Sequence, residues 1–275
     1  MTQIHPTAIV DPAARLDATV EVGPYAIIEA GTTIGAGTII GPHAWIRAGT
    51  TLGARNHIHY GAIIGHWPQD LAFTGQQSFV RIGDDNQIRE YATIHRGTTP
   101  DSATTVGDHC FLMGCAHLAH NCRIGNHVII ANNALLAGYA EVEDHAFISG
   151  HCVVHQFTRI GRLAMLSGMT AVGKDVPPYC LAMLRNHVAG LNVVGLRRAG
   201  MPPAVRMEIK QAFRLLYLDG LHLRHAIERI AQIATSAEVR HLLAFLRASK
   251  RGLCPHRYQV AANPELEKEV PDDKI

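Results

Sequence analysis

Two histidines stand three positions apart in the segment GCAHLAHNC, residues 114–122. His117 and His120 could ligate a metal, could include a catalytic general base, or could lie on a strand surface without a chemical role. The chain contains 18 histidines, so the surroundings have to single out this pair. A spacing of three places side chains on one face of a helix but on opposite faces of a strand. The elements that carry the pair therefore decide between these interpretations.

An aliphatic residue recurs at every sixth position along most of the chain. In the series from Ile4 to Val172, 26 of the 29 positions hold Ile, Leu or Val. The three exceptions are Asp70, Gln76 and Pro100. A period of six fits neither an α-helix nor a simple amphipathic strand. It predicts a hexapeptide solenoid, a parallel β-helix whose triangular coils each take three hexads, about 18 residues.

The hexad phase survives two irregular segments, 66–79 and 97–104, which we expect to be loops extruded from the β-helix. Loops on a rigid scaffold are common places for binding residues. The β-helix is predicted over 1–190, and helical spacing then predicts a helical C-terminal domain over 191–254. The segment 255–275 is polar and is predicted to be a disordered tail.

Composition excludes several classes of protein. The net charge of +2 argues against a nucleic-acid binder, and no apolar run approaches the roughly 18 residues of a transmembrane segment. The N-terminus lacks the pattern of a secretory signal, and the six cysteines form no CxxC pair. These features predict reduced thiols and a cytoplasmic location.

A coil of 18 residues converts sequence distance into spatial distance. Positions 18 apart lie one rung apart, about 4.8 Å. Gly138 and then Gln156 therefore lie above His120, with Tyr139 and His155 beside them. We expect these side chains to form one patch on the outer surface of the coil. No carboxylate or thiolate of the neighbouring coils converges there, which favours a general base over a metal site.

Several segments resemble the family of cytoplasmic UDP-N-acetylglucosamine O-acyltransferases that begin lipid A biosynthesis. They are NCRIG, ANNALLAG, VVHQF, DVPPY and IREYATIHRGT, and the resemblance covers nearly the whole chain. It implies a left-handed parallel β-helix with a C-terminal helical domain, assembled as a homotrimer with active sites between neighbours. It also implies transfer of a (3-hydroxy)acyl chain from acyl carrier protein to the 3-hydroxyl of UDP-N-acetylglucosamine. The acyl chain would arrive on the phosphopantetheine of the carrier, with no metal and no other cofactor.

The resemblance also assigns roles to residues. His120 would be the general base, Asp70 would orient it or the sugar, and the backbone N–H of Gly150 would stabilise the oxyanion. The substrate-binding residues would be Gln69, His117, Tyr139, His155, Gln156, Asn192 and Arg198. The acyl-chain groove would include Gly168 and His187.

The chain departs from the family pattern mainly around the acceptor. The family usually has lysine in place of Ala72, histidine in place of Tyr139, glutamate in place of Val194 and arginine in place of Ala199. Arg185 stands where a glycine is expected. These changes beside an intact base support a second interpretation, a paralogue that acylates another nucleotide sugar by O- or N-acyl transfer.

Two further interpretations come from other classes of protein. One is a β-helix that serves as a scaffold without catalysis, which the presence of both His120 and Asp70 disfavours. The other is a carbonic-anhydrase-like β-helix with three histidines on zinc across a subunit interface, which a metal assay would test.

Overall fold

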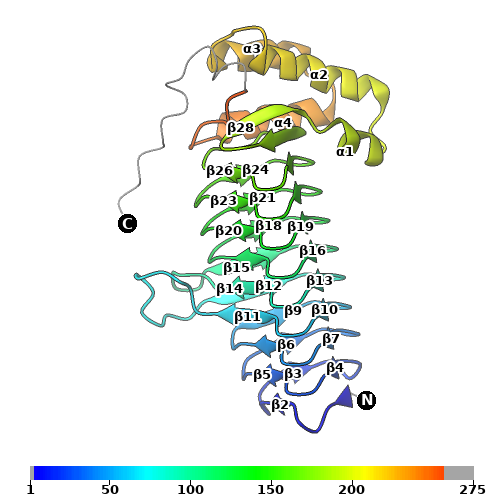
Figure 1. Ribbon diagram of the computed structural model, residues 1–275, viewed down its shortest axis with the longest axis vertical. Coiled ribbons are helices and arrows are strands. Elements are labelled where there is room, and N and C mark those ends of the chain that lie inside the picture. The colour runs from blue at the N-terminus through cyan, green and yellow to red at the C-terminus, as the bar shows by residue number, and fades with distance from the viewer. Residues whose placement is uncertain (1–2, 257–275) are drawn as a thin grey trace.

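The computed structural model describes residues 3–256 as a tall stack of short strands closed at one end by helices (Figure 1). The strands form three sheets that run the length of the stack. Neighbouring coils pair in parallel within each sheet, whereas the last pair of sheet 1, residues 180–183 with residues 187–191, is antiparallel. Sheet 1 contains β1 (Gln3–Ile4), β4 (Glu21–Val22), β7 (Ile39–Ile40), β10 (His57–Ile58), β13 (Gln87–Ile88), β16 (Phe111–Leu112), β19 (Ile129–Ile130), β22 (Phe147–Ile148), β25 (Met165–Leu166), β27 (Cys180–Met183) and β28 (His187–Leu191).

The other two sheets complete the triangular coils. Sheet 2 contains β2 (Ile9–Val10), β5 (Ile27–Ile28), β8 (Trp45–Ile46), β11 (Ile63–His66), β14 (Thr93–His95), β17 (His117–Leu118), β20 (Leu135–Leu136), β23 (Val153–Val154) and β26 (Ala171–Val172). Sheet 3 contains β3 (Arg15–Leu16), β6 (Thr33–Ile34), β9 (Thr50–Leu52), β12 (Phe79–Ile82), β15 (Ala103–Val106), β18 (Arg123–Ile124), β21 (Glu141–Val142) and β24 (Arg159–Ile160).

The hexad aliphatics form the interior of the stack. Ile58, Leu118 and Ile130 end three of the two-residue strands, and each is 0% exposed. Because side chains alternate along a strand, the preceding residue points outward and carries the surface chemistry of its sheet. Each coil buries its aliphatics on the coils above and below, so the core is continuous along the stack.

The two irregular segments leave the register of the stack intact. Most strands pair with a residue 18 positions further on, as His117 does with Leu135. Ile63 instead pairs with Thr93, a separation of 30, and Thr93 pairs with His117, a separation of 24. The first loop therefore adds 12 residues and the second adds 6, which are whole hexads. Strands occupy the ends of both predicted loops. β11 runs to His66, β12 begins at Phe79 and β15 begins at Ala103, all inside the ranges predicted for the loops.

The helices cover the last coil (Figure 1). They are α1 (Val193–Arg198), α2 (Pro203–Tyr217), α3 (Leu223–Ile233) and α4 (Ala237–Ala248). The hydroxyl of Ser236 caps α4 by accepting a hydrogen bond from the N–H of Val239 at 3.2 Å. Within residues 3–256, none of these helices has the length and apolar character needed to cross a bilayer.

After α4 the chain returns to the β-helix. The N–H of Cys254 donates to the carbonyl of Asp175, and the N–H of Asp175 donates to the carbonyl of Gly252, both at 2.9 Å. His256 is 3% exposed and forms a bridge with Val188, so the start of the predicted tail is packed. The rest of that tail, 257–275, lies outside the described residues.

Candidate active site

His120 lies in the turn between β17 and β18, beneath the loop that follows β11. Its Nε2 is 3.6 Å from Oδ2 of Asp70, a residue of that loop. His120 is only 7% exposed, so the expected patch on the outer surface is wrong for this residue. The imidazole does point outward from the coil, but the loop after β11 covers it. The loop also supplies the carboxylate of Asp70, which the stacking of coils alone did not predict. Over residues 3–256, no group of three or more His, Cys, Asp or Glu is placed to hold a metal ion.

The other ring nitrogen of His120 is held by its neighbour in sequence. Nδ1 lies 3.1 Å from Oδ1 of Asn121. The same oxygen accepts hydrogen bonds from the backbone N–H and from the hydroxyl of Thr98, each at 3.0 Å. A backbone N–H can only donate, so this atom of Asn121 is the amide oxygen and Nδ1 must donate to it. Nε2 is therefore the nitrogen with a lone pair, and it faces Asp70.

Two residues of the next coil shape the space around the imidazole. A Cβ at Gly138 would lie 2.4 Å from Nε2 of His120, so any side chain there would displace the ring. This contact confirms the predicted stacking of Gly138 on His120. The ring of Tyr139 meets the imidazole edge to face, with centroids 5.4 Å apart, and its hydroxyl lies 3.3 Å from that of Thr98. Tyr139 thus helps to position the base.

A buried histidine, His95, adjoins the pair His117 and His120. His95 is 5% exposed, and its ring centroid lies 4.9 Å from that of His117 and 6.0 Å from that of His66. Burial, with the neighbouring imidazoles His117, His66 and His120, lowers the pKa of His95 to about 4. Burial also lowers the pKa of His117, whose Nδ1 lies 2.7 Å from the hydroxyl of Thr93. His95 and His117 therefore stay uncharged at neutral pH.

The remaining predicted residues on this side of the molecule are more open. Gln69 is exposed in the loop next to Asp70, and Gln156 is half-buried. His155 is exposed, and its Nδ1 lies 3.4 Å from Nη2 of Arg251, a residue of the returning C-terminal segment. The coil stacking brings His155 and Gln156 to the same edge of sheet 2 as His120, two rungs further along the stack.

Other predicted residues lie elsewhere in the chain. Gly150 and Gly168 are neighbours, since the N–H of Met169 donates to the carbonyl of Gly150 at 3.0 Å. They occupy the turns that join sheet 1 to sheet 2, whereas His120 lies in a turn that joins sheet 2 to sheet 3. The two groups are therefore on opposite edges of sheet 2.

The α1 region is a third location. Asn192 is 9% exposed, and its Oδ1 caps α1 by accepting from the N–H of Gly195 at 3.0 Å. Its Nδ2 donates to the carbonyl of Leu163 at 2.9 Å. Arg198 is exposed at the end of α1, and His187 is half-buried at the start of β28. One chain therefore brings the base, its carboxylate and Tyr139 together, but not the residues of α1.

Three residues of this site were not selected from the sequence. Asn121 directly follows the base in the segment quoted first, so a search for partners of His120 could have found it. Thr98 lies in the second predicted loop, and its contact depends on the folding of that loop. His95 carried no signal beyond its position in IHRGT.

Comparison with known proteins defines the class of the chain. Residues 13–48 and 103–138 match the family model described as bacterial transferase hexapeptide (six repeats). Residues 175–254 match the model described as UDP N-acetylglucosamine O-acyltransferase, domain 2. The repeat fold and the site thus define a hexapeptide-repeat acyltransferase.

Full-length relatives give the particular family. The acyl-[acyl-carrier-protein]–UDP-N-acetylglucosamine O-acyltransferase of Trichlorobacter lovleyi is 52% identical over 257 residues, which cover 91% of this chain and 98% of the relative. The Myxococcus xanthus protein of the same name is 47% identical over 256 residues, covering 92% and 99%. The solved UDP-N-acetylglucosamine acyltransferase of Francisella novicida has a TM-score of 0.91 at 33% identity, covering 98% and 99%. The chain belongs to the UDP-N-acetylglucosamine O-acyltransferase family.

These likenesses confirm the predicted fold class and enzyme class. The structure is a left-handed parallel β-helix with a C-terminal helical region, and the chain is an acyltransferase. The interpretation as a scaffold without catalysis is not supported.

Proposed function

We propose that this chain transfers a (3-hydroxy)acyl chain from acyl carrier protein to the 3-hydroxyl of UDP-N-acetylglucosamine, the first step of lipid A biosynthesis. The names of the relatives support the two substrates. The observation that carries the mechanism is the arrangement of His120, with Nδ1 donating to Asn121 and Nε2 directed at Asp70.

This arrangement supports general base catalysis by His120. Nε2 accepts the proton of the sugar 3-hydroxyl as the oxygen attacks the thioester carbonyl. A new C–O bond forms, the C–S bond breaks, and the imidazolium returns the proton to the departing thiolate. Asp70 stabilises the imidazolium in between, because an opposite charge at about 4 Å favours the charged form. The backbone N–H of Gly150 is the proposed donor to the oxyanion.

We further propose a homotrimer whose active sites lie between neighbours. The outer face of sheet 1 presents an apolar row, Phe111, Ile129, Phe147 and Met165, whereas the same rungs of sheet 3 present Arg123, Glu141 and Arg159. An apolar row on one face fits contact with another copy, and a charged row fits solvent. A neighbouring copy is also the simplest way to bring Gly150, Asn192 and Arg198 to His120. We also propose a cytoplasmic location, which the acyl carrier protein named as donor by the relatives supports.

A second acceptor, another nucleotide sugar, is favoured by one observation. Ala72 and Ala199 are both exposed where the family usually has cations, and Val194 is 56% exposed in place of a glutamate. The N–H of Ala72 donates to Oδ1 of Asp70 at 2.9 Å, so this position lies beside the base. Loss of cations there weakens the contribution of charge-assisted hydrogen bonds to a diphosphate.

The test is an acyl-transfer assay with a panel of acceptors. UDP-N-acetylglucosamine, other UDP- and dTDP-linked sugars and their amino forms are each offered with hydroxyacyl carrier protein, and the products are identified by mass spectrometry. We expect an ester on the 3-oxygen of UDP-N-acetylglucosamine, and no product with His120→Ala. Transfer to another sugar alone would move the assignment to the second acceptor. Transfer to none of the panel would refute both.

A further inference from the structure

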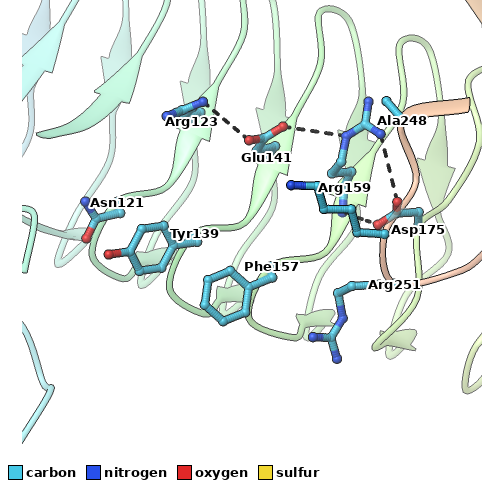
Figure 2. A pocket seen from close by; sticks show the side chains of 10 residues that line it. Asn121, Arg123, Tyr139, Glu141, Phe157, Arg159, Asp175, Ala248 and Arg251 are labelled. Atoms are coloured by element: carbon cyan, nitrogen blue, oxygen red, sulfur yellow. Dashed lines mark hydrogen bonds and ion pairs between the residues drawn. The ribbon is translucent and has the colours of Figure 1, made fainter. Parts of the chain in front are cut away.

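His120 receives its contacts from two parts of the chain. Asn121 and Tyr139 belong to the coils, in the row of side chains that Figure 2 shows, and the hexad packing fixes their positions. Asp70 belongs to the loop after β11, which interrupts the repeat. Leu71 beside it is 96% exposed, so this apolar side chain does not pack the loop onto its own coils. The position of Asp70 therefore depends on other contacts that hold the loop.

Aromatic side chains on either side of Asp70 close its turn. Trp67 and Phe73 lie three residues before and after it, and their ring centroids are 6.3 Å apart. The N–H of Phe73 donates to the carbonyl of Asp70 at 3.1 Å, and the N–H of Ala72 donates to its Oδ1 at 2.9 Å. Three residues of chain reach at most about 11 Å. A fixed Trp67 therefore limits how far Asp70 can move from His120.

An arginine of the coils contacts Trp67. Cζ of Arg47 lies 5.3 Å from the ring centroid of Trp67 and 4.8 Å from that of Trp45. A guanidinium over the face of an indole is attracted by the ring, and the attraction increases as water is excluded. Arg47 directly follows β8, a strand whose place the hexad packing fixes. Its contact with Trp67 thus joins the loop to the rigid part of the molecule.

Glu29 fixes the orientation of this guanidinium. Its Oε1 accepts hydrogen bonds from Nε of Arg47 at 3.0 Å and from Nε1 of Trp45 at 2.9 Å, and its Oε2 accepts from the N–H of Ala48 at 3.0 Å. Burial opposes ionisation of Glu29, but the N–H of Ala48 and the charge of Arg47 outweigh it and lower the pKa of Glu29 below its usual value. The Arg47 side chain is only 16% exposed, so salt screens this ion pair little.

We propose that Arg47 is a positioning residue for the reaction. Through Trp67 it holds the first part of the loop against the coils, and so keeps the carboxylate of Asp70 beside Nε2 of His120. We call Arg47 and its three partners the Arg47 cluster, the partners being Glu29, Trp45 and Trp67. This role rests on the proposed function, from which it takes the roles of Asp70 and His120.

Substitutions of Arg47 test this role by kinetics and by hydrogen exchange. Arg47→Gln removes the charge and the planar guanidinium. We expect kcat at saturating substrates to fall about threefold to tenfold, as for the loss of a partly buried cation–π contact, with the KM for acyl carrier protein thioester unchanged. Amide exchange in residues 66–79 should become faster. Arg47→Lys keeps the charge and should recover part of both effects.

Fluorescence follows the Arg47 cluster without turnover, since the chain has two tryptophans and both belong to the cluster. We expect acrylamide to quench Arg47→Gln more strongly than the wild type, because Trp67 is released into solvent. Trp67→Leu is a second variant. Trp67 is 54% exposed, so the variant should fold, and its kcat should fall as in Arg47→Gln.

Two controls separate positioning from stability. Arg55→Gln removes an arginine whose Nη2 lies 2.7 Å from Oδ2 of Asp85, in the turn between sheets 3 and 1, and it should match the wild type. Arg47→Gln combined with Asp70→Asn should lower kcat no further than Asp70→Asn alone, because the carboxylate that Arg47 positions is already absent. A purely structural role would lower kcat by the same factor with or without Asp70.

Several results would overturn the proposal. Unchanged kcat and unchanged exchange in a folded Arg47→Gln would show that the loop does not need this residue. An equal loss in Arg55→Gln, or the same loss in the Asp70→Asn background, would reduce the effect to stability. Exchange and quenching need no turnover, so unchanged values would overturn the Arg47 cluster and changed values would support it even if the proposed reaction fails.

Discussion

Oδ2 of Asp70 lies 3.6 Å from Nε2 of His120, although one residue comes from the loop after β11 and the other from the turn after β17. Because Nδ1 donates to Asn121, Nε2 of the neutral imidazole has no proton to donate to Asp70, so the two groups attract each other only when the imidazole is charged. The pair thus stabilises the state of His120 that forms as the acceptor hydroxyl loses its proton.

Removal of the base should abolish most of the activity. We expect His120→Ala to lower kcat by about 10² to 10⁴, because a positioned general base contributes that much. Asp70→Asn should lower kcat less, while it leaves the KM for the acyl donor unchanged. Steady-state kinetics test both, and thermal melting controls for folding because His120 is 7% exposed. Near-normal turnover in a folded His120→Ala would refute the mechanism.

The hydrogen bond from Nδ1 of His120 to Oδ1 of Asn121 can be tested by substitution of Asn121. Its φ of 59° lies in the left-handed region, so Asn121→Gly removes the acceptor without adding backbone strain. We expect kcat to fall about tenfold or more, because the imidazole loses the partner that fixes its tautomer. Asn121→Asp keeps an acceptor oxygen and should retain more activity than Asn121→Gly. Equal kcat values for both variants and the wild type would contradict the role of this contact.

The buried imidazole of His95 makes stability depend on pH. Its pKa of about 4 in the folded chain compares with 6.5 for an ordinary histidine. Between these values the unfolded chain binds a proton that the folded chain does not. His95 therefore does not lower the free energy of unfolding above about pH 6.5. As the pH falls from 6.5 toward 4, His95 lowers the free energy of unfolding by about 3 kcal/mol in all. Denaturation at several pH values should show a shallower acid slope for His95→Asn than for His5→Asn. Parallel slopes for the two variants would contradict this prediction.

Gly168 offers a test of the acyl groove. A Cβ at Gly168 would meet only the carbonyl of Gly150, at 3.7 Å, so a side chain fits without movement of the backbone. We expect Gly168→Met to shift the preference to shorter acyl chains, since each methylene excluded from a groove costs about 0.8 kcal/mol. Competition between carrier thioesters of different lengths measures this shift, with Gly168→Ala as the graded control. An unchanged preference for acyl length would show that the acyl chain does not bind beside Gly168.

The departures around the acceptor predict weak binding of UDP-N-acetylglucosamine. Ala72→Lys with Ala199→Arg introduces cations at two exposed positions where the resemblance to the family implies them. Each charge-assisted hydrogen bond contributes roughly 1.5 to 3 kcal/mol, so we expect the KM for this sugar to fall at least tenfold. The measurement is a titration on wild type and double variant, with a dTDP-linked sugar as comparison. Tight binding by the wild type and no gain in the variant would show that these positions do not contact the acceptor.

The coils were predictable because their information is local. Each buried aliphatic, such as Leu118 or Ile130, occupies the same place in every hexad, so the residue type alone defines the inward face. The stacking of Gly138 on His120 followed from the same arithmetic.

The site was less predictable where loops and the returning chain take part. The burial of His120 depends on how the first loop folds back over it. The hydrogen bonds from Thr98 to Asn121 depend on the fold of the second loop. The placement of Arg251 requires the path of the chain after α4. These contacts join segments that are distant in the sequence, and none of them recurs from coil to coil. A periodic pattern in the sequence therefore cannot predict them.

The strand register of the stack does not depend on the two loops that carry part of the candidate site. Both loops insert whole hexads, so the strands on either side meet their partners as if no residues had been added. Natural variation can therefore lengthen, exchange or rewrite the segment that carries Asp70 while the coil carrying His120 stays in place. The carboxylate partner of the base can thus change without any change in the buried aliphatics that stabilise the coils.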